Sequence, residues 1–368
     1  MQVYLQRFYF FFSLLYNLDM SDAPSTNYFK ERNRKNTQKI KELMAYLPSF
    51  CYEFFIGIEN RTTPLTRVNY AYDLRIFFDF LTKEIDDFYG KNVKDITLSD
   101  LDGLTQTHVE IYLNYLNDYI FDGKEYSNDE RGKSRKLASL RTFLKYFFNK
   151  DKLKSNVATK VAMPKLHGKG IIRLEGDEVS SIIDLAESGE LATKRQEAFH
   201  KHTKVRDYAL LTLLLGTGIR VSECVGLNVE DVFFNNNSFK ITRKGGEQVI
   251  LYFNEEVEYA LKQYIAERNQ IKGIDTEKAL FLSLQKKRIG VRAVEKLVKK
   301  YASIVSPLKK ITPHKLRSTY GTNLYQQTRD IYIVADVLGH KDINTTKKHY
   351  AAQVDDNRRN AATKIKLR

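Results

Sequence analysis

Hydrophobic residues recur at helical spacing along most of the chain, and short polar or glycine-containing breaks separate the runs. Apolar positions three or four residues apart predict helices that bury one face. In the N-terminal half, a charged helical segment at 30–41 is followed by helical runs at 43–58, 68–81, 109–119 and 137–147. Thr63-Pro64 and Thr97 mark two helix starts, and the polar segment 122–132 is expected to be a loop. This half is therefore predicted to be an all-helical bundle of about four helices, with the aromatic run at 43–58 in its core.

The C-terminal half combines helical runs with a short stretch of alternating residues. Helices are predicted at 175–186, 208–215, 255–269 and 292–301, with further helical segments beginning near 219, 314, 331 and 355. The segment 194–204 is predicted as a loop or a helix. Alternation between 232 and 253 predicts short strands, and Gly245-Gly246 supplies a tight hairpin turn between two of them. The fold class is therefore mainly α, with a helical bundle followed by a mixed α+β domain that carries a small antiparallel sheet.

The length of the chain, 368 residues, predicts two domains, and a basic segment that contains proline and glycine separates its two halves. The boundaries expected from the pattern are an N-terminal extension at 1–29, a helical domain at 30–162, a basic linker at 163–172 and a second domain with its tail at 173–368.

The first twenty residues need a separate interpretation. The apolar run Phe8 to Leu15 is too short to span a bilayer. No convincing small-residue cleavage site follows it, and Met20 begins a polar segment that resembles an ordinary start. We interpret this stretch as a non-essential extension, or as a start codon placed too early, rather than as an export signal.

Charge narrows the range of partners. The chain has 60 Lys and Arg against 45 Asp and Glu, a net charge of +15, which favours a polyanion. The positive charge is spread along the chain, which argues against a membrane surface. Two cysteines imply no disulfide framework and favour a reducing compartment, the cytoplasm. No cluster has the spacing of a metal site, and His200-Lys201-His202 is interpreted as solvated surface.

Three short segments near the C-terminus bring together residues that suit an oxyanion. Pro313 is expected to start a helix, which places His314 and Arg317 on one face. Gly339 follows an apolar run and is expected to end a helix, leaving His340 on a turn. Tyr350 follows, although it is one of 23 tyrosines. Arginine and histidine donors of this kind suit a phosphodiester.

Two further residues are candidates only in combination with these. Arg220 follows a glycine-containing break, and Glu223 lies on the same helix face, where it can hold the guanidinium; an exposed pair of little consequence is the alternative. Lys244 is expected at the hairpin tip, either solvated or able to deliver a proton. The segment Gly216-Thr217-Gly218 has no Walker pattern, so no nucleotide site is indicated.

Basic residues flank the apolar stripe of the predicted helix at 137–147. Their charge suits contact with DNA phosphates or a solvated face. The expected DNA contacts are Lys133, Arg135, Lys136, Arg141 and, beside Lys244, Arg243.

The order of these groups resembles that of the tyrosine recombinase (integrase) family. The resemblance covers about 40–355, and it is closest to the single-protein Xer recombinases of Gram-positive bacteria. The motifs that carry it are 242–246 (Thr-Arg-Lys-Gly-Gly), 312–317 (Thr-Pro-His-Lys-Leu-Arg) and 338–340 (Leu-Gly-His). The resemblance implies that the helical half is a core-binding domain that clamps DNA, and that the second half is the catalytic domain.

The resemblance also implies a role for each group. Tyr350 would attack a phosphodiester and form a 3′-phosphotyrosine. Arg220, Arg317 and His340 would bind the phosphate oxygens, with Arg220 oriented by Glu223. His314 would act as general base and Lys244 as general acid. No metal, nucleotide or other cofactor is expected, and the partners implied are double-stranded DNA recombination sites and further copies of the chain, as a tetramer on DNA.

Small departures and two alternatives remain. Ser318 stands where many relatives have another basic residue or a histidine, and ten positions separate His340 from Tyr350. The function implied is site-specific recombination, either to resolve chromosome dimers or to integrate and excise a mobile element. The alternatives are a type IB topoisomerase and a catalytically silent DNA-binding regulator.

Overall fold

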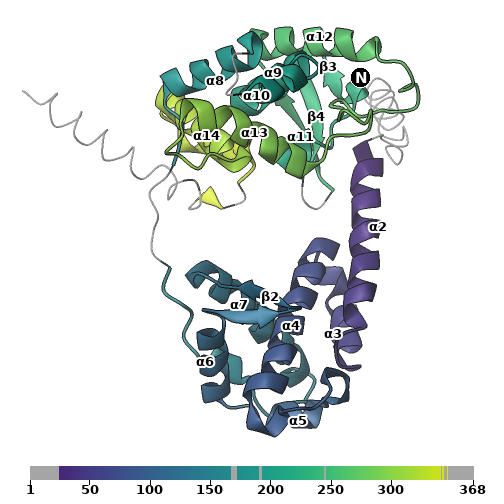
Figure 1. Cartoon of the computed structure of the whole chain (residues 1–368), viewed down its shortest axis with the longest axis vertical. Helices are drawn as coiled ribbons and strands as arrows, with labels where there is room; N and C mark the ends of the chain where they lie inside the picture. The colour runs from purple at the N-terminus through teal and green to yellow at the C-terminus, as the bar shows by residue number, and fades with distance from the viewer. Residues whose placement is uncertain are drawn as a thin grey trace, which may run out of the picture. The chain divides into compact units, whose positions relative to one another are not determined.

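The computed structural model describes residues 25–166, 172–189, 193–243, 246–340, 342, 343 and 346. Its internal contacts divide the chain into two compact units (Figure 1). The N-terminal unit comprises Phe29–Lys169, and the C-terminal unit comprises the rest of the chain. Most of the expected N-terminal extension lies outside the described residues.

The N-terminal unit is built mainly from helices. They are α2 (Ser25–Met44), α3 (Cys51–Gly57), α4 (Pro64–Glu84), α5 (Leu98–Asp102), α6 (Gln106–Tyr115) and α7 (Glu130–Phe148). Two of the starts are those that the sequence predicts. The Thr63 side chain accepts a hydrogen bond from the N–H of Thr66, with Pro64 in the first turn, and Thr97 forms a capping box with Asp100.

One prediction for this unit is wrong. The segment expected to be a polar loop contains the second strand of a hairpin, β1 (Tyr119–Phe121) and β2 (Lys124–Tyr126), together with the first turn of α7. The hairpin forms because Asp122 and Gly123 both adopt positive φ, 48° and 71°, which the tight two-residue turn requires. The unit is therefore helical with one short hairpin rather than all-helical.

Aromatic side chains fill the core of the N-terminal unit. Pro48 separates α2 from α3, and Phe50 and Phe54 then pack against residues of α7. The rings of Phe54 and Phe143 lie 5.1 Å apart in an edge-to-face arrangement, and both side chains are fully buried. The prediction that the aromatic run belongs to the core is confirmed for Phe54 and Phe55, whereas Tyr46 and Tyr52 are 60% and 59% exposed.

The C-terminal unit surrounds a small sheet with helices. The helices are α8 (Gly176–Ser188), α9 (Lys194–His200), α10 (Lys204–Thr217), α11 (Val221–Cys224), α12 (Glu255–Asn269), α13 (Val291–Val305), α14 (Pro313–Thr328) and α15 (Ile331–Leu338). The strands are β3 (Val232–Phe233), β4 (Ser238–Thr242) and β5 (Gln248–Tyr252). Short 3₁₀ turns in the two units occupy Glu59–Arg61, Asp86–Phe88, Val93–Asp95, Val157–Thr159 and Val229–Asp231.

Helix α10 forms the centre of this unit, because its residues from Tyr208 to Leu215 are almost continuously apolar. Ala209, Leu210, Leu213 and Leu214 are completely or almost completely buried. The helix packs against α8, α12 and α14, which Figure 1 shows grouped around it. A helical segment without a polar face has to be covered by neighbours, so the predicted buried helix at 208–215 is confirmed.

The three strands form one antiparallel sheet in the order β3–β4–β5. The register of the hairpin pairs Thr242 with Gln248, and the N–H of Arg243 donates to the carbonyl of Glu247 at 2.8 Å. The predicted hairpin and the α+β character of the unit are confirmed. Lys244 and Gly245 lie outside the described residues.

A second prediction is wrong at His200, which is buried and not solvated, with 4% of its surface exposed. Its Nδ1 lies 2.9 Å from the Tyr301 hydroxyl, which in turn donates to Asp207 at 3.0 Å. Burial lowers the pKa of His200 and raises the pKa of Tyr301, and Asp207 raises the tyrosine's pKa further. The sequence did not indicate this burial, because most residues of α9 are polar and only contacts with distant elements bury its last residue, His200.

Two general features of the described residues bear on function. Cys51 and Cys224 are both buried and free. Among the described helices, none is long and apolar enough to cross a membrane.

Candidate active site

Helix α14 begins as its sequence predicts. Thr312 is the N-cap and Pro313 occupies the first turn, where its missing N–H would have no helical partner. His314 is exposed at this end, whereas Arg317, one turn later, has only 6% of its surface exposed. The helix therefore presents a histidine to solvent beside an arginine held inside the unit.

Helix α15 also ends where the sequence predicts. Gly339 adopts the left-handed conformation, with φ 59° and ψ 50°, and the N–H of His340 donates to Ala335 at 2.9 Å. The turn leaves the His340 ring half-buried, with Nδ1 2.8 Å from the Thr346 hydroxyl. This contact fixes the orientation of the imidazole.

Arg220 is held by the carboxylate that follows it. Gly218 ends α10 in the left-handed conformation, and Arg220 then caps α11. Glu223 accepts from the Arg220 backbone N–H at 3.0 Å and from Nη1 at 2.9 Å. Because Glu223 is only 4% exposed, this is not a solvent-exposed pair of little consequence.

The C-terminus of α15 brings three arginines together. Arg220 Nη2 donates to the carbonyl of Gly339 at 3.1 Å, and Arg317 Nη2 donates to that of Leu338. Arg243 Nη2 donates to the carbonyl of Val337 at 3.3 Å. We refer to Arg220, Arg243 and Arg317 as the arginine cluster. The last carbonyls of a helix have no helical donor and carry the negative end of its dipole, so they are natural acceptors for guanidinium groups.

The contacts of Arg220 leave this residue able to bind a phosphate. A guanidinium carries five N–H donors in a planar fork. The contacts of Arg220 use one bond from Nη1 and one from Nη2, and the side chain is still 37% exposed. Contacts to the protein can therefore fix the Arg220 guanidinium without exhausting its donors.

Two of the candidate residues cannot be placed. Lys244 and Tyr350 lie outside the described residues, as do His349 and the tail that follows. The structure thus brings together Arg220, Glu223, Arg317 and the turn before His340, and the positions of the lysine and the tyrosine stay predictions.

The basic residues of α7 make several contacts within the N-terminal unit. Lys133 donates to Asn117, and the buried Lys136 donates to Asn128 at 2.7 Å. Arg141 donates to the carbonyls of Ala158 and Val161. Their role as DNA contacts stays a prediction.

Arg135 differs from these residues because its side chain is 51% exposed. Its Nη1 lies 2.5 Å from Oδ2 of Asp73, a carboxylate that is 2% exposed on α4. Burial raises the pKa of Asp73, although Arg135 and Ser139 oppose the shift. The sequence analysis did not identify Asp73 as a partner of Arg135. Its position between apolar residues of a predicted helix could have indicated a buried aspartate that needs a basic partner.

Sequence reasoning also missed the inward contact of Arg243, which it assigned to DNA. Nothing in the local pattern distinguishes an arginine at a strand end that reaches a helix from one that points to solvent. The only signal was Gly339, whose missing side chain leaves room for a neighbour.

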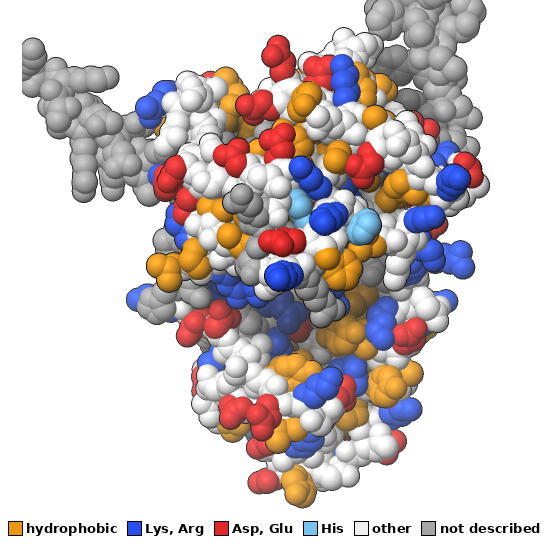
Figure 2. Space-filling model, turned by 45° about the horizontal axis from the view of Figure 1, so that its top comes forward, with side chains coloured by type: hydrophobic (Ala, Val, Ile, Leu, Met, Phe, Trp, Pro, Cys, Tyr) orange, Lys and Arg blue, Asp and Glu red, His pale blue; other side chains and the backbone are white. Residues whose placement is uncertain are grey.

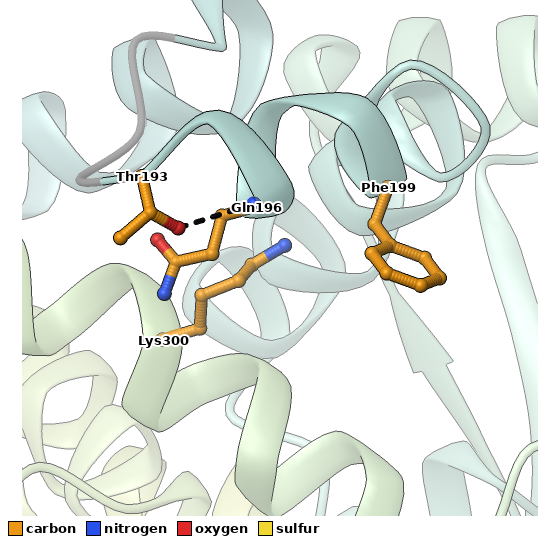
Figure 3. A pocket seen from close by; sticks show the side chains of 4 residues that line it. All are labelled: Thr193, Gln196, Phe199 and Lys300. Carbon is orange, nitrogen blue, oxygen red and sulfur yellow. Dashed lines mark hydrogen bonds between the residues drawn. The ribbon is translucent and has the colours of Figure 1, made fainter.

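A pocket of about 360 Å³ lies elsewhere in the C-terminal unit, between α9 and α13 (Figure 3). Thr193, Gln196, Phe199 and Lys300 line it, and none of them belongs to the candidate site. The Lys300 ammonium is bound to the buried Asp207 at 2.9 Å, so its charge is compensated within the unit. This pocket has no evident part in phosphate chemistry.

The charged side chains on the face shown in Figure 2 are mixed. Lys and Arg side chains lie among Asp and Glu side chains over much of this face.

Comparison with solved structures defines the class of the fold. The chain is similar to the XerH site-specific recombinase bound to a palindromic difH substrate, with a TM-score of 0.59 and 19% identity over 83% of this chain and 81% of that one. It is also similar to a lambda integrase dimer bound to a COC′ core site, with a TM-score of 0.56 and 16% identity over 82% of this chain and 94% of that one. The fold is that of the tyrosine recombinases.

Sequence comparison identifies the family. Residues 173–357 match the phage integrase family. The chain is 35% identical to tyrosine recombinase XerC of Caldanaerobacter subterraneus subsp. tengcongensis over 82% of this chain and 81% of the relative. It is 27% identical to tyrosine recombinase XerS of Lactococcus lactis subsp. cremoris over 90% and 98%. The chain belongs to the phage integrase family and is a site-specific tyrosine recombinase, which confirms the resemblance to Xer recombinases.

Proposed function

We propose that this recombinase cleaves and rejoins double-stranded DNA through a 3′-phosphotyrosine on Tyr350. The observation that carries the proposal is that Arg220 and Arg317, from separate helices, bind the adjacent carbonyls of Gly339 and Leu338. Two guanidinium groups held side by side match the two non-bridging oxygens of a phosphodiester.

Each bond and proton in the proposed reaction is accounted for without a cofactor. The phenol oxygen of Tyr350 attacks phosphorus and gives its proton to His314, while the bond from phosphorus to the 5′ oxygen breaks. The leaving 5′ oxygen takes a proton from Lys244 and becomes a hydroxyl. Arg220, Arg317 and His340 stabilise the negative charge that builds on the phosphate oxygens.

The immobilised groups support these roles. Glu223 holds Arg220 through both of its oxygens, and Thr346 orients His340. Rejoining is the reverse reaction, with the 5′ hydroxyl of a new strand as the attacking group. The phosphotyrosine bond retains the energy of the broken diester, so the reaction needs no ATP.

The proposal extends to the organisation of the chain. Residues 30–162 would form the DNA-clamping domain, 163–172 a basic linker and 173–368 the catalytic domain. XerH and lambda integrase are bound to DNA sites in their solved structures, which supports duplex DNA as the partner here. A tetramer on two DNA sites, working in the cytoplasm, is the assembly we propose.

Trapping the covalent intermediate tests the proposal. Sheared genomic DNA from the cell that encodes the chain is incubated with the full-length protein, denatured in detergent and sequenced where protein remains attached. A nicked duplex of the recovered site should then give a stable adduct with the wild type and none with Tyr350→Phe. Adduct formation by Tyr350→Phe, or binding with no adduct at any site, would overturn the proposal.

A second assay separates recombination from simple relaxation. Two labelled duplexes that carry the recovered site should exchange strands. Relaxation of a supercoiled plasmid without such exchange would instead indicate topoisomerase activity.

A further inference from the structure

Arg243 sits at the base of the β4–β5 hairpin, one residue before Lys244. Its backbone N–H donates to Glu247 at 2.8 Å, and its carbonyl accepts from Gly246 at 3.1 Å. The backbone of Arg243 therefore belongs to the hydrogen-bonded end of the hairpin, from which the turn begins.

The side chain of Arg243 points to another element. Its Nη2 donates to the Val337 carbonyl, and its guanidinium lies directly against Gly339. A Cβ atom added at Gly339 would lie 2.3 Å from Arg243 Cζ, far inside van der Waals contact. The two residues approach this closely only because position 339 has no side chain.

The guanidinium is directed inward. The Nε of Arg243 is buried and has no hydrogen-bond partner among the described residues. The side chain as a whole is half-buried, and its donors face the end of α15. An arginine that contacts DNA phosphates would instead be expected to extend into solvent in the free protein.

We propose that Arg243 is a positioning residue that ties the base of the β4–β5 hairpin to the C-terminal turn of α15. The tie fixes the strand end that leads into Lys244 relative to the turn that carries His340. This inference rests on the proposed function, since it concerns the delivery of a proton by Lys244. It replaces the sequence-based assignment of Arg243 as a DNA contact.

The chemistry of the leaving group allows an effect of Arg243 on proton donation by Lys244 to be separated from other effects on cleavage. A 5′ oxygen leaves as an alkoxide unless it is protonated, so cleavage depends on a well-placed general acid. A sulfur in the same bridging position leaves as a thiolate, whose conjugate acid is far stronger, and needs no proton. A defect in the placement of Lys244 should therefore disappear with the sulfur-containing substrate.

The experiment measures single-turnover cleavage by full-length Arg243→Ala. The nicked duplexes carry either oxygen or sulfur at the 5′ bridging position, and DNA is saturating. We expect cleavage of the oxygen substrate to fall about 10- to 100-fold, in the range of a displaced general acid. Cleavage of the sulfur substrate should stay within about threefold of the wild type, and the Kd for DNA should change less than about threefold.

Matched variants sharpen the result. Arg243→Met keeps most of the volume without the donors, and it replaces Arg243→Ala if the alanine variant does not fold. Arg243→Lys should not restore the rate, because an ammonium lacks the planar fork that lies against Gly339. Lys244→Ala should show the same rescue by sulfur, whereas Arg220→Ala should be slow with both substrates.

Each alternative outcome has a separate meaning. A higher Kd with an unchanged rate at saturation would make Arg243 a DNA contact and overturn the inference. Equal slowing on both substrates would show that Arg243 acts through Arg220 and Arg317 rather than through Lys244, and would also overturn the inference. If Lys244→Ala cleaves both substrates at the wild-type rate, the proposed role of Lys244 fails, and the route we assign to Arg243 fails with it.

Discussion

Gly339 shows how much of the site depends on a single residue. It ends α15 with a positive φ of 59°, and its carbonyl accepts from Arg220. Its missing side chain admits the guanidinium of Arg243. Gly339 thus ends the helix, accepts a hydrogen bond from Arg220 and allows Arg243 to approach closely.

Gly339→Ala should impair cleavage as well as folding. The new Cβ meets Arg243 at 2.3 Å, and the left-handed conformation costs about 1–2 kcal/mol in addition. Gly273→Ala is the matched control, because Gly273 also has a positive φ, of 77°, but nothing lies within 4 Å. Both variants should lower the unfolding temperature, and only Gly339→Ala should slow adduct formation, about tenfold or more. Equal activities of the two variants would contradict this reading.

Glu223→Gln should weaken the hold on Arg220 with little change in shape. Both carboxylate oxygens accept from Arg220, one from the backbone and one from Nη1. A glutamine presents an NH₂ group to one of these donors, so one buried bond is replaced by a repulsive contact. We expect a decrease of about tenfold in the rate of adduct formation at saturating DNA. A Kd for DNA that rises with no change in this rate would show that Glu223 does not act through the orientation of Arg220.

At the scale of elements, the start of α8 is tied to the end of α13 through one carboxylate. Glu178 accepts from the N–H of Glu175, from the Ser306 hydroxyl and from the Lys309 ammonium. Partial burial raises the pKa of Glu178, but these donors outweigh it and lower the pKa to about 2. The ionised form therefore stabilises the packing of the two helices.

Glu178→Gln should destabilise the C-terminal unit in a pH-dependent way. A carboxyl whose pKa is lower in the folded state stabilises the fold above its ordinary value of 4.5, and this contribution is lost as pH falls toward 2. Allowing for solvent screening, we expect a loss of about 1 kcal/mol at pH 7. Urea midpoints of wild type and variant should differ at pH 7 and converge as the pH falls toward 2. A difference that stays constant with pH would rule out ionised Glu178 as its source.

At the scale of the whole molecule, the net charge of +15 accompanies many internal contacts of basic residues. Arg135 is exposed although Asp73 holds it, whereas Arg141 donates to the Ala158 and Val161 carbonyls. Residues of the same charge on one helix should therefore differ in what their removal does.

Arg135→Ala should affect DNA binding, and Arg141→Ala should affect folding. Each phosphate contact contributes about 0.9 to the slope of log K against log salt, so Arg135→Ala should reduce the slope by about that amount. Arg141→Ala removes two hydrogen bonds and should cost about 1–3 kcal/mol of stability in the N-terminal unit. Binding titrations at several salt concentrations, together with urea unfolding, check both. A reduced slope for Arg141→Ala in a fully folded protein would contradict the assignment.

The helices that were predicted best from the sequence are those that residues within the helix itself, or directly beside it, determine. The apolar run of α10, the capping residues Thr63 and Thr97 and the first-turn Pro313 each act on their own segment. The β1–β2 hairpin was missed because its strands are only three residues long, too short to show alternation. His200 was misjudged because its burial depends on Tyr301, which is distant in the sequence.

The sequence by itself determined the class of fold, the order of the functional groups and the turn at Gly339, since helix periodicity, capping and glycine conformation are properties of neighbouring residues. Only the tertiary structure decided that Arg220, Arg243 and Arg317 meet at the end of α15, and that the carboxylate of Glu223, which holds Arg220, is buried. The physical reason is that an arginine reaches whichever acceptor the packing of helices leaves unsatisfied, and that acceptor is set by elements far apart in the chain.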